Sequence, residues 1–115
     1  MALPKKTVDV LGVKYSVYEL DKKEDKFLEN ADGYCDKTTK KIVITTKGDD
    51  NQLEDFEVYR KGILRHELLH AFLFESGLHE NMTHPQYGHD EEMIDWFAKM
   101  YPRISKAYKD LGVSD

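Results

Sequence analysis

The sequence predicts an α+β fold in which a small, mainly antiparallel sheet precedes two helices. Residues 1–48 contain short apolar stretches separated by turn-forming residues, which is typical of strands. Residues 52–77 and 90–111 instead carry apolar side chains at three- and four-residue spacing, which is typical of helices that pack on a core. A chain of 115 residues supports one hydrophobic core, so we expect a single domain over residues 1–115.

Three segments of the first half read as strands. Residues 8–20 are rich in Val, Tyr and Leu and are interrupted by Gly12, which predicts a strand or a hairpin. The turn-forming residues 30–33 lead into a second strand at 34–35. Residues 41–46 then favour a third strand.

The second half carries the two helices. The first is expected over 52–77 and to end at Gly77, a common helix C-cap, while Gly62 allows a break within it. The second is expected over 90–111. Pro102 predicts a kink or a helix boundary near Tyr101, and thus a break near residue 102, because proline lacks a backbone N–H and clashes with the preceding turn.

The first helix contains the motif HExxH, formed by His66, Glu67 and His70. Two histidines four residues apart lie one turn apart on the same face, so both imidazoles can reach one metal ion. Glu67 is placed to take a proton from a metal-bound water. The surrounding residues are largely apolar, and polar groups in such a helix need partners. The pattern indicates a zinc site for metal-assisted hydrolysis.

A catalytic zinc usually has a third protein ligand and one open position. The candidates that follow the motif are His79, His84, His89, Glu91 and Glu92. The metzincin pattern HExxHxxGxxH is excluded, because Leu73 and Ser76 stand where it needs Gly and His.

The spacing after the motif resembles that of the thermolysin-like gluzincins, which place a glutamate ligand about 20 residues after HExxH on a second helix. Glu91 follows His70 by 21 positions and Asp95 follows Glu91 by four. The resemblance implies that Glu91 is the third ligand and that Asp95 orients His66, as a carboxylate behind a ligating histidine does. Glu92 is the alternative ligand, because a small rotation of the helix would exchange the two.

The chain as a whole resembles the ImmA/IrrE-type metallopeptidase domain and its small phage- and prophage-encoded relatives. The resemblance covers roughly residues 30–100 and rests on residues 33–36, 41–44, 65–70 and 91–98. It implies a minimal zincin-like domain and regulatory rather than digestive proteolysis, since better-known members cleave transcriptional repressors. Unlike those members, this chain has no recognisable helix-turn-helix or sensor segment.

These observations lead to a mechanistic hypothesis with one Zn²⁺ per chain, held by His66, His70 and Glu91. Glu67 acts as the general base in the hydrolysis of a peptide or protein substrate. Tyr87 is the candidate donor to the oxyanion, since a neutral phenol can donate a hydrogen bond; His84 and His89 lie in the same segment and are alternatives.

By the same resemblance, an edge strand beside the motif helix would bind the substrate as an added strand. The strand expected at residues 41–46 is assigned to that edge, with Ile42, Val43 and Ile44 as substrate-binding residues. An ordinary buried strand is the alternative for this segment.

Composition excludes several other classes of protein. A net charge of −5 argues against a nucleic-acid partner. No stretch is long and apolar enough for a membrane span, and no signal peptide is recognisable. Cys35 is the only cysteine, so no intramolecular disulfide is possible, and together with the missing signal peptide this favours a cytoplasmic location. Cys35 itself is expected to be a small core residue.

The leading alternative function is a catalytically silent, zinc-stabilised binding or regulatory protein of phage origin. The shortness of the chain, at 115 residues, leaves little room for a deep cleft and favours this alternative. The presence of Glu67 favours the peptidase, because a purely structural zinc site needs no general base beside its ligands.

Overall fold

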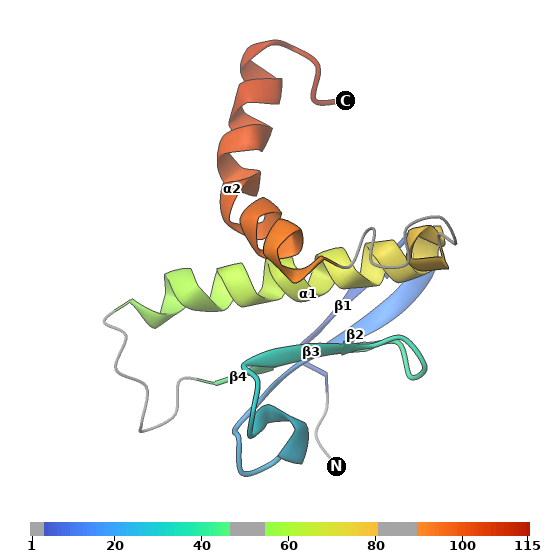
Figure 1. Ribbon diagram of the computed structural model, residues 1–115, viewed down its shortest axis with the longest axis vertical. Coiled ribbons are helices and arrows are strands. Elements are labelled where there is room, and N and C mark those ends of the chain that lie inside the picture. The colour runs from blue at the N-terminus through green and yellow to red at the C-terminus, as the bar shows by residue number, and fades with distance from the viewer. Residues whose placement is uncertain (1–3, 47–54, 81–89) are drawn as a thin grey trace.

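The computed structural model describes residues 4–46, 55–80 and 90–115. In this part of the chain the predicted α+β class is confirmed: a four-stranded mixed sheet has helix α1 across one face, and helix α2 lies across α1 (Figure 1). Within the same residues, neither helix is long and apolar enough to cross a bilayer.

The chain begins with a tight β-hairpin. Strands β1 (Lys6–Val10) and β2 (Val13–Leu20) pair in antiparallel fashion across the two-residue turn Leu11-Gly12. Both turn residues have positive φ angles, 51° and 87°. This is the pattern of a type I′ turn, whose twist matches that of the two strands. Of the two alternatives for residues 8–20, the structure therefore has the hairpin.

The remaining strands are β3 (Gly33–Asp36) and β4 (Lys41–Thr45), and the sheet has the order β1-β2-β4-β3. Strand β4 runs parallel to β2 and antiparallel to β3. The sheet is thus mixed, with two antiparallel pairings and one parallel pairing.

The prediction that Ile42, Val43 and Ile44 form the sheet edge is wrong, because β4 lies between β2 and β3. All three side chains are buried, with 0–1% of their surface exposed. Three consecutive apolar residues are typical of a strand covered on both faces. In the described residues the edge near α1 is β3.

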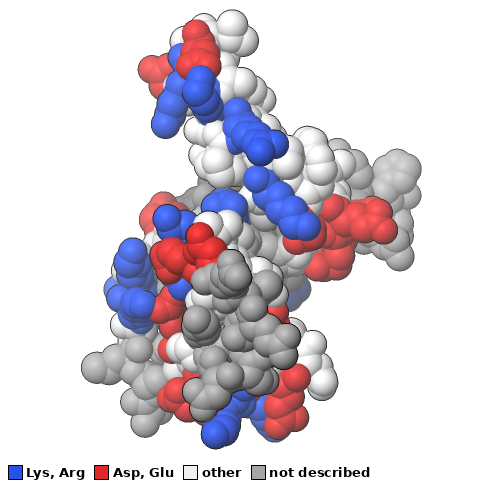
Figure 2. Space-filling view, turned by 90° about the vertical axis from the view of Figure 1, so that its left-hand side faces the viewer, with Lys and Arg blue, Asp and Glu red and all other residues white. Residues whose placement is uncertain are grey.

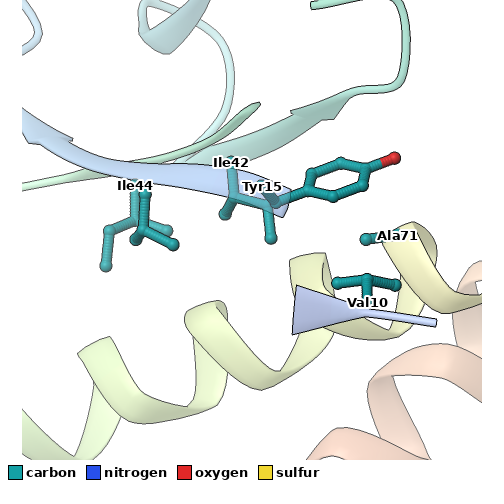
Figure 3. Packing of buried hydrophobic residues seen from close by; sticks show 6 residues of the cluster. Val10, Tyr15, Ile42, Ile44 and Ala71 are labelled. Atoms are coloured by element: carbon teal, nitrogen blue, oxygen red, sulfur yellow. The ribbon is translucent and has the colours of Figure 1, made fainter. Parts of the chain in front are cut away.

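The core lies between the sheet and α1 (Figure 3). It consists of buried residues from both layers: Val10, Tyr15, Val17, Ile42, Ile44 and Ala71. The Tyr15 hydroxyl donates to a carboxylate oxygen of Glu75 at 2.7 Å, and Lys40 contacts the same oxygen at 2.8 Å. The polar end of a buried ring is thereby satisfied at the margin of the core.

Helix α1 (Phe56–Ser76) carries the HExxH motif and passes through Gly62 without a break. Asp55 caps its first turn by accepting from the Val58 N–H at 3.2 Å. Gly77 ends it in the left-handed conformation, with φ of 83°. The helix expected over 52–77 therefore begins at 56 in the described residues and ends where the glycine predicts.

Helix α2 (Glu91–Asp110) begins at the Asp90 N-cap and buries Ile94 and Ala98. Its first half crosses α1 and its second half projects away from the body (Figure 1). The helix boundary predicted near residue 102 is wrong, because α2 is continuous through Pro102, whereas the kink that was its alternative stays a prediction. The carbonyl of Ala98, which Pro102 cannot bond, accepts instead from Arg65 Nε at 2.6 Å.

Candidate metal centre

The two motif histidines lie on one face of α1. The ring centroids of His66 and His70 are 5.0 Å apart, as one helical turn dictates. Both side chains are largely covered, with 18% and 13% of their surface exposed. The Nε2 atom of each ring reaches the first residue of α2.

That residue is Glu91, which the Asp90 cap places at the start of the helix, beside both rings. One carboxylate oxygen lies 3.1 Å from His66 Nε2 and the other lies 2.9 Å from His70 Nε2. The ligand atoms of the three side chains all lie within 4.8 Å of one another. His66, His70 and Glu91 thus form a group that can hold a metal ion.

The other described candidates lie outside this group. Glu92 follows Glu91 by about 100° around the helix, so its carboxylate projects to another side. His79 sits in the short 3₁₀ helix Leu78–Glu80, where its Nδ1 lies 3.3 Å from the Leu73 carbonyl oxygen. His84, Tyr87 and His89, including the predicted oxyanion donor, lie outside the described residues.

Asp95 lies behind the first histidine. One of its carboxylate oxygens is 3.6 Å from His66 Nδ1, the ring nitrogen that does not face Glu91. The other oxygen is 3.1 Å from Lys99 Nζ, one turn further along α2. A carboxylate at Nδ1 favours a proton on that nitrogen and leaves Nε2 available as a ligand.

Glu67 is the only charged residue among the buried described residues, with 8% of its surface exposed. Burial raises the pKa of its carboxyl group to about 7; His66 opposes the rise and Glu91 adds to it. Gly33 of β3 lies close above it, since a Cβ there would stand 3.3 Å from Glu67 Cγ. The strand can pass this near to α1 because residue 33 has no side chain.

A cleft of about 570 Å³ opens beside these groups. It lies where the start of β3, the N-terminal part of α1 and the first turns of α2 meet. Its lining contains His66, Glu67, Glu91, Asp95 and Lys99 from the site, together with Ala31, Asp32, Gly33, Val58, Tyr59, Gly62, Ile63 and Arg65. The buried carboxylate and two of the three metal-binding residues, His66 and Glu91, therefore share one solvent-accessible space.

No family model, curated protein or solved structure matches this chain. What the site can do therefore rests on its own geometry.

Two cleft residues, Tyr59 and Lys99, were not among the sequence predictions. The Tyr59 hydroxyl donates to the Asp32 carboxylate, and this bond raises the pKa of the phenol to about 12, so it stays neutral. Helical spacing could have placed both residues beside the site. Tyr59 precedes His66 by seven residues and Lys99 follows Glu91 by eight, about two turns in each case, so each lies on the same side of its helix as a proposed ligand.

Proposed function

We propose that this chain is a zinc-dependent peptidase whose metal ligands are His66, His70 and Glu91. Ligands bound to zinc at about 2.0–2.1 Å and near the tetrahedral angle lie about 3.3 Å apart. The ligand atoms of His66, His70 and Glu91 lie within 4.8 Å of one another, and a different carboxylate oxygen of Glu91 faces each histidine, at 3.1 and 2.9 Å, so small side-chain adjustments would reach this spacing. Two imidazole nitrogens with one carboxylate also leave a fourth position open, as catalytic zinc sites do.

The resemblance to the gluzincins supports the same ligand set. It implies a glutamate ligand on a second helix and an aspartate near the first histidine. Glu91 and Asp95 occupy such positions relative to His66, at 3.1 and 3.6 Å. Zinc held there would supply Lewis acidity and lower the pKa of a bound water.

In this proposal Glu67 is the general base. Its carboxylate accepts a proton from the attacking water and passes it to the leaving amine when the peptide bond breaks. The observation that carries the proposal is that this buried carboxylate and the three ligand groups line or adjoin one cleft. A site that only stabilised the fold would have no use for a buried carboxylate facing solvent-accessible space.

The substrate that fits this cleft is a peptide in extended conformation. Strand β3 ends the sheet in the described residues, and Ala31, Asp32 and Gly33 line the cleft. An extended peptide can add to the edge of a sheet through main-chain hydrogen bonds. In the proposed complex β3 takes the role that the sequence suggested for residues 41–46, and the scissile bond lies near His66 and Glu67.

The test compares Glu67→Gln with Glu92→Gln, a matched change one position from a proposed ligand. The probe is a library of quenched fluorescent peptides, incubated with zinc-loaded protein. The wild type and Glu92→Gln should cleave at similar rates. Glu67→Gln should keep its zinc and lose at least about 100-fold in rate, the usual contribution of a general base.

Two results would count against the proposal. Cleavage by Glu67→Gln at the wild-type rate would remove the assigned base. If the wild type binds zinc but cleaves no peptide in the library, the result would instead favour the alternative function, a catalytically silent, zinc-stabilised binding protein.

A further inference from the structure

A second hollow, with a volume of about 440 Å³, opens where α1 meets the projecting half of α2. This basic hollow is lined by Arg65 of α1 and by Tyr101, Pro102, Ser105, Lys106 and Lys109 of α2. Among these described residues three are basic and none is acidic. The whole chain, in contrast, has a net charge of −5. Positive charge is therefore concentrated at one place on an acidic molecule.

Nearby carboxylates neutralise only part of this charge. Lys106 pairs with Asp110 at 2.7 Å, so its contribution is offset. Neither Arg65 nor Lys109 has an ion-pair partner in the part of the chain that the structure describes. Figure 2 shows basic side chains following one another along the projecting part of the molecule. Two uncompensated cations, Arg65 and Lys109, thus face the same hollow.

Arg65 is held in a position suited to an anion. Its Nε donates to the Ala98 carbonyl at 2.6 Å, which fixes the guanidinium between the two helices. The residue is half-buried, and its Nη atoms have no hydrogen-bond acceptor among residues 4–46, 55–80 and 90–115. A cation that has lost part of its water gains most from a charged partner, and the free N–H groups of a guanidinium match a carboxylate.

The position of the hollow indicates what kind of anion it meets. Arg65 also lines the cleft beside the metal centre, so the two spaces adjoin at this residue. A peptide that leaves the cleft along α2 would meet Arg65 first and Lys109 next. Tyr101, which is 47% exposed, and Pro102 add apolar surface for the stems of its side chains. A nucleic acid is disfavoured, because its phosphates would extend past the hollow over an acidic surface.

We propose that the basic hollow binds an acidic segment of a peptide or protein chain, with carboxylates at Arg65 and Lys109. The substrate would then carry acidic residues next to the stretch that lies in the cleft. The choice of a peptide as the occupant rests on the proposed function. Binding of the acidic segment itself needs neither zinc nor turnover, so its failure would leave the zinc and cleavage tests untouched.

An NMR titration of the full-length, ¹⁵N-labelled chain with acetyl-tetraglutamate amide tests the proposal. The uncharged control is acetyl-tetraglutamine amide. The glutamate peptide should shift the amide signals of Tyr101, Ser105 and Lys109, and its binding should weaken as salt is added. The glutamine peptide should shift none of them. Absence of binding by the glutamate peptide, or shifts confined to residues outside the hollow, would overturn the proposal.

A charge reversal at Lys109 separates the hollow from general attraction by surface charge. The matched control, Lys23→Glu, makes the same change between β2 and β3, in a segment on the other side of the sheet from α2 (Figure 1). Lys109→Glu should weaken binding of the glutamate peptide at least about fivefold, with an otherwise unchanged spectrum, and Lys23→Glu should bind like the wild type. Equal weakening in both variants would contradict the proposal. Inorganic phosphate that binds the hollow as tightly as the peptide would mean a site for small anions, and would also overturn it.

Discussion

Arg65 of α1 donates from its Nε to the main-chain carbonyl of Ala98 in α2, at 2.6 Å. In a regular helix that carbonyl would accept from the N–H of residue 102, and Pro102 has none. A side chain from the neighbouring helix therefore supplies the hydrogen bond that the proline removes. The same contact fixes α2 against α1 one turn after Ile94, and so helps to hold Glu91 near the two histidines.

This relationship predicts that Arg65 and Pro102 are energetically coupled. Arg65→Ala should lower the free energy of unfolding by about 1–3 kcal/mol, since it leaves the carbonyl of a buried residue unpaired. In a Pro102→Ala background the loss should be smaller, because the restored backbone N–H can bond that carbonyl. Urea unfolding of the wild type, both single variants and the double variant measures the coupling, and strictly additive effects would contradict it.

Gly33→Ala should destabilise the protein by about 1–3 kcal/mol, the usual range for overpacking. The added Cβ would stand 2.8 Å from Ile63 Cγ2 and 3.1 Å from the Val43 carbonyl oxygen. Gly62→Ala is the matched control, because its Cβ would meet nothing within 4 Å. In the middle of α1 it should raise stability by up to about 1 kcal/mol. The melting temperatures of both variants test this expectation. Equal changes in the two variants would contradict the close packing of Gly33 against α1.

Asp36 should contribute to stability in a pH-dependent manner. Its carboxylate accepts from the Thr38 hydroxyl and from the backbone N–H groups of Thr38 and Thr39, and these bonds lower its pKa to about 2. A lowered pKa means that the unfolded chain binds the proton more readily. The contribution is therefore complete above about pH 4 and is lost as the pH falls toward 2.

The variant Asp36→Asn keeps an oxygen acceptor but cannot titrate. The difference in unfolding free energy between wild type and variant, measured by urea at several values between pH 5 and pH 2, should shrink as the pH falls. Taking the difference cancels the titration of the other carboxylates. A difference that stays constant would show that the charge of Asp36 is not involved.

Cys35 should be a slow thiol. Burial raises its pKa to about 12, and the nearby Glu67 and Asp36 carboxylates add to the rise. Because the thiolate is the reactive form, the native protein at pH 8 should react with a disulfide reagent at least about 100-fold more slowly than the protein unfolded in guanidinium. Similar rates in both states would mean that the thiol is accessible and ionised in the fold.

Much of the candidate metal centre could be predicted from local spacing. The HExxH pattern places two histidines on one helical face, and the interval to Glu91 allows a second helix to bring a carboxylate beside them. The choice between Glu91 and Glu92 depends on the rotation of α2 about its axis. The Asp90 cap and the burial of Ile94 set that rotation, and the second of these is a tertiary contact.

The two wrong predictions depend on tertiary contacts. A strand was expected at residues 41–46 and is present at 41–45, but the neighbours of a strand depend on how distant segments pair, here β2 with β4. The helix boundary expected at Pro102 is absent, and Arg65, 37 positions earlier, supplies a hydrogen bond to the carbonyl that the proline leaves unpaired. Neither the pairing of β2 with β4 nor the hydrogen bond of Arg65 can be predicted from the spacing of neighbouring residues in the sequence.

The most direct test of the central claim is the zinc content of the untagged chain, measured by elemental mass spectrometry after dialysis against zinc and gel filtration. The wild type and Glu92→Ala should each retain about one zinc per chain, whereas His66→Ala and Glu91→Ala should lose most of it. Retention by all four proteins would place the metal elsewhere. A wild type that binds no zinc would contradict the assignment of His66, His70 and Glu91 as a metal centre.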